Sequence, residues 1–383
     1  MDRQKIKKRY LPLYMFVFSA VSACSLFPTD RGTSPPPASN HPSFFAPQSS
    51  RAAFKPDPLP VNRPVQQTFE ADPVRYATLS GDGRLMVAIS EMDGISRMVL
   101  RPVNPSRDAP PRVLPHLSGS VMWPALSRDG RWLAFQGTAF DVKGDIYLID
   151  LTSQNQRPIR LTDRATGDGA PAFSPDGTDL YFHQSSSKNP GRRLMRIPLP
   201  ETLSQSAVSG PITPALQALP VDGDGSFPAI SPDGVRMAFV SRREDPNGDI
   251  FLLDLKTQDV RRITQGPAID AQPCWSRDGD FIYFSRMVPQ RSADAGTEHA
   301  EAIRLYRIAA KHPGAMPYPL TSGAYEAYQP MLTKSGLYFI THRRGIPNVW
   351  ALPPGAKSQN AIRFKNSSIS RKTWAYASHR MTG

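Results

Sequence analysis

A short turn sequence recurs six times along this chain of 383 residues, and this recurrence constrains the fold more than any other feature. Its clearest form, WPALSRDGRWLAFQ, begins at Trp123. The other copies begin at Tyr76, Ala170, Phe227, Gln272 and Gln329, of which the first and last are the weakest. The Asp of the Asp-Gly pair, replaced by Ser335 in the last copy, falls at Asp82, Asp129, Asp176, Asp233 and Asp278. The steps of 47, 47, 57, 45 and 57 residues indicate repeated units of several strands each.

Each copy predicts two antiparallel strands joined by a tight turn. A short apolar segment such as PAFS leads into Pro-Asp-Gly or Arg-Asp-Gly, and an alternating segment such as LYFHQ follows. Asp-Gly provides the left-handed backbone that a tight hairpin needs. Segments such as GDIYLIDL at Gly144 indicate a third strand, and IRLT at Ile159 or RRIT at Arg261 indicates a fourth. Because no blade can bury both of its faces alone, the sequence predicts an all-β fold, a six-bladed β-propeller of four-stranded antiparallel blades.

The repeat resembles a known family. The unit x-P-x-[FWIL]-S-x-D-G-x-x-[ILM]-x-F, followed by G-D-I-[YF]-L-[IL]-D-L and R-[IL]-T, is similar to the WD-like propeller repeat of the TolB family over residues 73–365. The resemblance implies the fold and a soluble periplasmic component of the Tol–Pal system, whose propeller binds a peptidoglycan-associated lipoprotein. The chain departs from that family because a proline-rich segment stands where the family has an α/β domain, and because it carries a lipidation motif.

The first residues predict export and lipid attachment. Basic residues give the first ten positions a net charge of +4, out of +13 for the chain. They precede the apolar run LPLYMFVFSAVSA, which is shorter than the about 20 residues that span a bilayer but long enough for a signal-peptide core. The run ends in VSAC, which resembles a bacterial lipobox, so we expect a signal peptide over residues 1–23 and lipidation of Cys24. An ordinary secretory signal with an incidental cysteine is the alternative.

The remaining chain divides into three parts. Prolines recur between Leu26 and Pro64, so residues 24–64 are expected to form a lipidated N-terminus and a semi-rigid tether. Residues 65–365 are the propeller, and residues 366–383 are a basic C-terminal tail. Ser25, which follows the lipidated cysteine, favours the outer membrane over the inner, with the protein facing the periplasm.

The topology predicts which loops share a face. The Asp-Gly hairpins lie on one side of the ring, here called the hairpin face. The loops that lead into the innermost strands and those that join second to third strands lie on the other side, the loop face. Near its axis we expect the carboxylates Asp168, Asp224, Asp270 and Glu326. Farther out we expect the cations Lys188, Arg192, Arg193, Arg242, Arg243, Arg286, Arg343 and Arg344. The functional interpretation is a polar docking face for a protein or an anionic envelope component, and ordinary solvated loops are the alternative.

No constellation in the sequence predicts catalysis. Peptidases with this kind of propeller need a G-x-S-x-G nucleophile motif, which the sequence lacks. His183 and His342, with His116 as a third candidate, lack the spacing of a metal site. The segment DGDGS begins like a calcium loop, but Asp233 stands where that loop needs Glu. Cys274 is expected to be a buried thiol, and no metal or other cofactor is expected.

The sequence thus favours a monomeric, lipid-anchored binding or scaffold module of the cell envelope. Its expected partner is an envelope protein, such as a peptidoglycan-associated lipoprotein or another acidic partner, and not a nucleic acid. The alternative is a propeller enzyme, a lyase or hydrolase, that acts on an envelope glycan or peptide at the axial channel.

The lipobox gives a first testable prediction. Replacing Cys24→Ala removes the thiol that would carry the lipid, so we expect no lipid on the protein and loss from the membrane fraction where cleavage still occurs. Mass spectrometry of the N-terminus and membrane fractionation measure both effects. An unlipidated wild-type N-terminus with unchanged fractionation would contradict the prediction.

Overall fold

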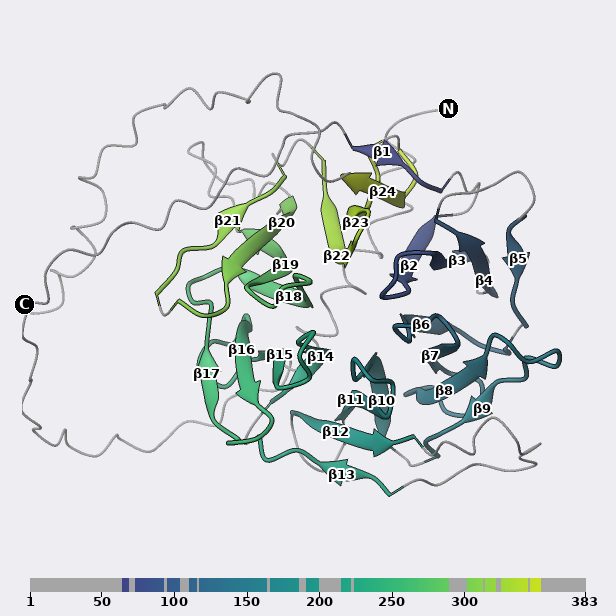
Figure 1. Ribbon diagram of the computed structural model, residues 1–383, viewed down its shortest axis with the longest axis horizontal. Helices are drawn as coiled ribbons and strands as arrows, with labels where there is room; N and C mark the ends of the chain where they lie inside the picture. The colour runs from purple at the N-terminus through teal and green to yellow at the C-terminus, as the bar shows by residue number, and fades with distance from the viewer. Residues whose placement is uncertain are drawn as a thin grey trace, which may run out of the picture.

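Six four-stranded antiparallel sheets surround a central axis as the blades of a β-propeller, which confirms the predicted fold (Figure 1). The computed structural model describes residues 64–352 except 69–72, 93–94, 104–109, 116, 164–165, 186–190, 200–214, 222–223, 289–301, 313, 322–324 and 344. The predicted signal peptide, Cys24, the tether before Pro64 and the basic tail lie outside these residues, as do Lys188, Arg344 and His116. The described part of the chain has no helix long and apolar enough to cross a bilayer.

The first five blades follow the chain from the innermost strand outward. Blade one contains β2 (Val74–Leu79), β3 (Leu85–Met92), β4 (Ile95–Pro102) and β5 (Arg112–Val113). Blade two contains β6 (Val121–Leu126), β7 (Trp132–Gly137), β8 (Asp145–Asp150) and β9 (Ile159–Arg160). Blade three contains β10 (Gly167–Phe173), β11 (Asp179–Ser185), β12 (Arg192–Pro198) and β13 (Gln217–Ala218). Blade four contains β14 (Ser226–Ile230), β15 (Arg236–Ser241), β16 (Asp249–Asp254) and β17 (Val260–Arg262). Blade five contains β18 (Ile269–Trp275), β19 (Phe281–Val288), β20 (Ala302–Ala309) and β21 (Tyr318–Pro319).

Blade six is completed by the N-terminal end of the ring. Its inner strands are β22 (Ala327–Thr333), β23 (Gly336–Thr341) and β24 (Asn348–Leu352), and its outermost strand is β1 (Val65–Gln66). Val65 pairs with Ala351 and Gln66 with Trp350. The Thr68 hydroxyl donates to Asn348 Oδ1 at 2.7 Å and accepts the Val349 N–H at 3.0 Å. The two ends of the ring are therefore joined by hydrogen bonds.

Repeated aromatic residues of the second strands form much of the core between the blades. Phe135, Phe182, Phe239, Phe284 and Phe339 occupy the same position in blades two to six, and all are 0% exposed. Burying each of these rings contributes on the order of 2 kcal/mol relative to leaving it in water. The aromatic position of the sequence repeat is thus a packing position.

The repeated Ser-x-Asp-Gly segment forms the hairpins. The Ser127 hydroxyl donates to Asp129 Oδ1 at 2.6 Å and accepts the Trp132 N–H at 2.9 Å. The Gly130 N–H donates to the Ser127 carbonyl, and Gly130 has a φ of 77°. In the equivalent turn of blade three, the hydrogen bond from Ser174 lowers the pKa of Asp176, so this carboxylate is held in its charged form. The prediction that the repeated Asp is a turn residue is confirmed.

The R-[IL]-T segment closes the outer half of a blade. Thr162 Oγ1 accepts the Ile146 N–H at 3.0 Å, and Thr264 Oγ1 accepts the Ile250 N–H at 2.8 Å in blade four. The arginine of the segment reaches the Asp of G-D-I, as in the 2.8 Å contact between Arg160 and Asp145. The threonine and the arginine therefore tie the short fourth strand to the third.

The innermost strands bend at a bulge that the sequence did not reveal. Trp123, Ala170, Phe227, Gln272 and Gln329 have φ angles of 50° to 54°, and a proline follows each of them. The strand register shifts at the same places. Proline has no N–H for the strand ladder, and a positive φ is uncommon outside glycine. Each bulge is therefore unfavourable for the local backbone and must be stabilised by the packing around it. In blades two to six, the residue at the bulge lines the pocket at the axis of the ring.

Blade one lacks this proline, and its backbone serves the ring closure instead. Ala77 stands at the proline position. The Gln329 side chain of blade six donates to the Ala77 carbonyl at 2.8 Å and accepts the Ala77 N–H at 3.3 Å. A proline at position 77 could not make the second contact.

The hairpin geometry gives a second prediction. Gly177 has a φ of 77°, and an added Cβ would meet nothing within 4 Å, so Gly177→Val tests backbone conformation alone. We expect a loss of more than about 1 kcal/mol of unfolding free energy, measured by urea denaturation. Gly177→Asn, which tolerates the left-handed region, is the control and should lose less. Equal stability of Gly177→Val and wild type would contradict the turn assignment.

Candidate functional site

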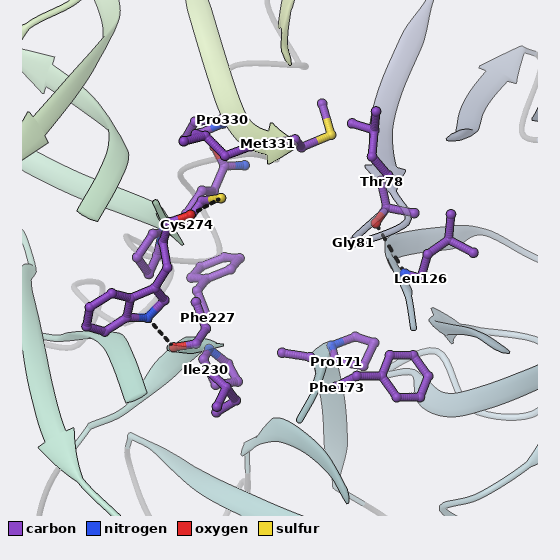
Figure 2. A pocket seen from close by; sticks show the side chains of 18 of the residues that line it. Thr78, Gly81, Leu126, Pro171, Phe173, Phe227, Ile230, Cys274, Pro330 and Met331 are labelled. Carbon is purple, nitrogen blue, oxygen red and sulfur yellow. Dashed lines mark hydrogen bonds between the residues drawn. The ribbon is translucent and has the colours of Figure 1, made fainter. Parts of the chain in front are cut away.

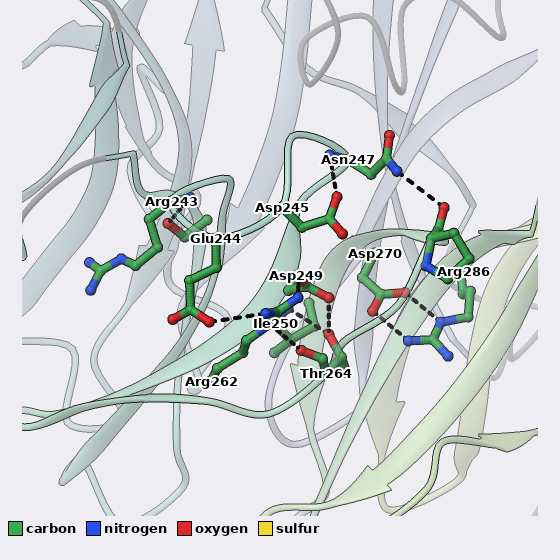
Figure 3. A network of polar contacts seen from close by, with 12 residues as sticks. Arg243, Glu244, Asp245, Asn247, Asp249, Ile250, Arg262, Thr264, Asp270 and Arg286 are labelled. Atoms are coloured by element: carbon green, nitrogen blue, oxygen red, sulfur yellow. Dashed lines mark hydrogen bonds and ion pairs between the residues drawn. The ribbon is translucent and has the colours of Figure 1, made fainter. Parts of the chain in front are cut away.

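The four carboxylates predicted for the loop face are paired with side chains of their own blades. Each pairs across the hairpin with a residue near the end of the second strand. Asp270 accepts two hydrogen bonds from Arg286, at 2.6 and 2.7 Å (Figure 3). The other pairs are Asp168 with Gln184 at 3.0 Å, Asp224 with Arg242 at 2.9 Å, and Glu326 with His342 at 3.1 Å. The structure thus joins two predicted acids to two predicted cations, Arg242 and Arg286.

Burial changes the chemistry of these carboxyl groups. Asp168 and Asp270 are 0% exposed. Burial raises the pKa of Asp168 to about 6 and also raises that of Asp270, although Arg286 opposes the rise in Asp270. These carboxyl groups are paired inside their own blades, and they are not an open ring of negative charge.

Glu326 and His342 form a neutral pair. Burial raises the pKa of Glu326 to about 8 and lowers the pKa of His342 below its ordinary value. Both shifts favour uncharged forms at neutral pH, so the 3.1 Å contact is best described as a carboxyl O–H that donates to the imidazole Nε2.

A larger polar network links blades four and five (Figure 3). Arg262 contacts Asp249 at 2.5 Å and Glu244 at 3.0 Å. The Thr264 hydroxyl lies 3.3 Å from Asp249 Oδ1, and the Asp270 N–H donates to the Gly248 carbonyl. Burial raises the pKa of Asp249 to about 6 despite the contact with Arg262. The network holds the boundary between the two blades.

The other predicted cations lie in different surroundings. Arg193, Arg243 and Arg343 are exposed. The Arg243 guanidinium lies over the Phe251 ring, and that of Arg343 lies over Tyr325 and Trp350. Arg192 donates its backbone N–H to Asp224. Whether this face binds a partner stays a prediction.

Residues considered for metal binding are dispersed. His183 is buried, and burial lowers its pKa well below the ordinary value. His342 is engaged with Glu326. Within the described ranges, no three His, Cys, Asp or Glu residues come together in a way that could hold a metal ion. Cys274 is half-buried with a pKa raised to about 11 by burial, so it is a protonated thiol.

A cup at the axis opens on the hairpin face and is the more distinctive site (Figure 2). Its volume is about 390 Å³. Its floor consists of the residues at the bulges, Trp123, Ala170, Phe227, Gln272 and Gln329. The Trp123 and Phe227 rings meet with centroids 4.9 Å apart although blade three lies between their blades. Ala170 is the small residue that leaves room for this contact, so the two rings close the axis beneath the cup.

Prolines and apolar side chains form the wall of the cup. Seven prolines among the described residues line the cup: Pro124, Pro171, Pro228, Pro273 and Pro330 follow the bulge residues, and Pro175 and Pro232 belong to hairpins. Ile230, Phe173 and Met331 lie around the same opening (Figure 2). The wall is held in place, since the Trp275 indole N–H donates to the Ala229 carbonyl at 2.9 Å and the Arg236 guanidinium lies over the Trp275 ring.

Two arginines stand at the mouth of the cup. Arg128 and Arg277 come from the hairpins of blades two and five, which are on opposite sides of a six-bladed ring. Both are exposed, and neither has an ion-pair partner in the part of the chain that the structure describes. The cup therefore combines an apolar interior with a cationic mouth.

The repeat pattern by itself does not predict the cup. The proline that follows each bulge residue is the sequence signal for the cup. The bulge forms only because the residue before this proline is left-handed, and residues that precede proline normally avoid helical conformations.

Comparisons with known proteins concern the fold. No protein-family model matches the chain. The uncharacterized protein Atu1656 of Agrobacterium fabrum is 27% identical over 226 residues, which are 55% of this chain and 69% of that protein. The uncharacterized peptidase YuxL of Bacillus subtilis is 25% identical over 172 residues, which are 43% of this chain but only 24% of the peptidase.

Two solved structures are similar to this chain at low identity and over part of its length. A putative TolB from Agrobacterium tumefaciens gives a TM-score of 0.46 at 21% identity and covers 61% of this chain and 73% of that one. TolB from Acinetobacter baumannii gives a TM-score of 0.49 at 17% identity and covers 72% of this chain and 65% of that one. These similarities concern the fold alone.

The neutral pair in blade six gives a third prediction. Because the pKa of Glu326 is raised to about 8 in the folded protein, its stabilising contribution is complete below the ordinary pKa of 4.5 and is lost as the pH rises through 8. Glu326→Gln should therefore be more stable than wild type at pH 9 and similar to it at pH 5. Urea denaturation at the two pH values measures this. A variant that is less stable than wild type at pH 9 would show that the carboxylate is needed.

Proposed function

We propose that the chain is a lipid-anchored binding module of the cell envelope whose axial cup receives an apolar segment of a partner protein. The observation that carries this proposal is the composition of the cup. Its volume of about 390 Å³ lies within the range of ligand-binding pockets. Its lining combines prolines and apolar side chains with the polar side chains of Thr78, Ser174, Ser276, Gln272 and Gln329. Both features suit a short side-chain cluster or peptide segment.

The same composition favours binding over catalysis. The described lining residues include no Asp, Glu or His that could act as a general acid or base. The one thiol among them, Cys274, has a pKa raised to about 11, so it is not a nucleophile at neutral pH. A propeller enzyme acting at the axis remains the alternative, and it would need its catalytic groups from elsewhere.

The rigidity of the cup supports a binding role. The Gln272 side-chain carbonyl accepts hydrogen bonds from the Ser285 hydroxyl at 2.8 Å and the Gln329 N–H at 3.0 Å. With the Gln329 contacts to Ala77, these bonds fix the floor across three blades. A preformed cup loses little conformational freedom when a ligand enters, so more of the contact energy appears as affinity.

The mouth indicates the charge of the partner. Arg128 and Arg277 stand on opposite sides of the opening. A segment with acidic residues beside its apolar part would approach such a mouth favourably, since exposed charges raise the association rate. The sequence favours an acidic envelope partner, such as a peptidoglycan-associated lipoprotein, but on the loop face, whereas the cup would receive it on the hairpin face.

The fourth prediction tests the cup directly. The double variant Arg128→Glu with Arg277→Glu reverses the mouth, and Ala229→Phe fills the interior next to the wall. We expect each to weaken capture of the partner from detergent-solubilised envelopes by about tenfold, which corresponds to about 1.4 kcal/mol. Capture is measured by quantitative mass spectrometry at several protein concentrations.

Arg84→Glu with Lys334→Glu is the matched control. Both residues are exposed on the hairpin face but do not line the cup, and the change in net charge is the same. Equal losses in the two double variants would mean that net charge, and not the cup, governs capture. Unchanged capture by Ala229→Phe with an intact fold would remove the interior from the proposal.

A further inference from the structure

Three neighbouring loops of the loop face each carry an exposed large apolar side chain. These loops join the second and third strands of blades six, one and two, which are consecutive in the ring. The side chains are Ile346 in blade six, Ile95 in blade one, and Phe140 and Val142 in blade two. Their exposed fractions are 37%, 57%, 74% and 90%. Single exposed apolar side chains are normal on protein surfaces, but here they recur at the equivalent place in three consecutive blades.

A basic residue accompanies each apolar tip. Arg343 precedes Ile346 by three residues, Arg97 follows Ile95 by two, and Lys143 follows Val142 directly. All three are exposed. In blade two the Arg160 guanidinium also lies over the Phe140 ring, 5.3 Å from its centroid. The loops therefore present apolar and cationic groups together.

The bases of these loops are fixed to the next blade. The Pro347 carbonyl accepts the Val74 N–H at 2.9 Å, the Ser96 hydroxyl accepts the Val121 N–H at 2.9 Å, and the Gly144 carbonyl accepts the Asp168 N–H at 2.9 Å. In each of the three blades, a described residue close to the connection is thus bonded to the start of the innermost strand that follows around the ring.

We propose that this part of the loop face docks on the surface of an anionic lipid bilayer. The tips would insert shallowly among the lipid chains at the interface, while Arg343, Arg97 and Lys143 contact the phosphates of the headgroups. Three separate apolar tips on one side of the propeller can each enter a flat, deformable lipid surface without forming a continuous patch. A protein partner would instead be expected to meet a continuous apolar patch with a polar rim.

The charge of the rest of the face agrees with this partner. Arg193 and Arg243 are exposed on the same face in blades three and four. Two carboxylates of this face are withdrawn into pairs, Asp224 with Arg242 and Asp270 with Arg286. Asp141, Asp163 and Glu244, by contrast, stay at least partly exposed. Docking in this orientation turns the hairpin face, and the mouth of the cup, away from the membrane. The inference does not depend on what the cup binds.

Position-specific fluorescence tests the proposal in the full chain. In a Cys24→Ala, Cys274→Ser background, an environment-sensitive fluorophore is attached to Val142→Cys in one protein and to Lys334→Cys on the hairpin face in another. With vesicles of phosphatidylglycerol and phosphatidylcholine, we expect the label at 142 to shift to shorter wavelength and brighten about threefold, as for a group that enters the interface. The label at 334 should not change. Vesicles of phosphatidylcholine alone should give a much smaller shift at 142.

Both labelled proteins share the same N-terminal segment, so recruitment by that segment alone does not distinguish them. Adding Ile95→Ser, Phe140→Ser and Lys143→Glu to the 142-labelled protein should abolish its shift. These positions are exposed, and an unchanged melting temperature shows that the fold is retained. The proposal is overturned if the label at 142 does not respond to anionic vesicles, if both labels respond equally, or if only a solubilised envelope protein shifts the label at 142.

Discussion

The pairing of β1 with β24 is the interaction on which both candidate surfaces depend. Five blades are built from consecutive strands, but blade six takes its outermost strand from the N-terminal side of the ring. Thr68 adds hydrogen bonds to Asn348 and Val349, and Gln329 joins blade six to Ala77 of blade one. The cup and the loop face each draw a few residues from every blade, so neither surface has a defined geometry in an open ring. The stability of the whole therefore rests on a contact between segments about 280 residues apart.

The sequence predicted those parts of the fold that depend on local chemistry. The Ser-x-Asp-Gly turns repeat because the same hydroxyl, carboxylate and glycine conformation are needed in each hairpin. The R-[IL]-T segments repeat because a threonine and an arginine hold the short fourth strand. The sequence does not reveal the strand at Val65, because this segment has neither the arginine nor the aliphatic residue of R-[IL]-T. Only its threonine, Thr68, bonds to the third strand as the other threonines do. The bulges escaped notice because a left-handed residue before proline contradicts the usual preference of such positions.

The arrangement of charge on the loop face depended on register, which the sequence leaves undetermined. An acidic ring inside a basic ring was expected, yet Asp270 lies opposite Arg286 in the strand pairing and binds it directly. Asp168 lies opposite Gln184 in the same way. A shift of one residue would place each carboxylate on the other side of its strand. Some charged residues of this face are therefore paired within the blades, while Arg193, Arg243 and Arg343 stay exposed.

The residues that form the floor of the cup differ from blade to blade, although the blades themselves are built alike. Blades two to four contribute Trp123, Ala170 and Phe227, while blades five and six contribute Gln272 and Gln329. One half of the floor is therefore aromatic and the other half carries amides. A guest that enters a ring of six similar blades would otherwise have six comparable orientations to choose from. The two sides of the floor differ chemically: one carries aromatic rings, and the other carries Gln272, whose Nε2 has no hydrogen-bond partner among the described residues. A guest with one apolar side and one hydrogen-bond acceptor can therefore bind in a single rotational setting.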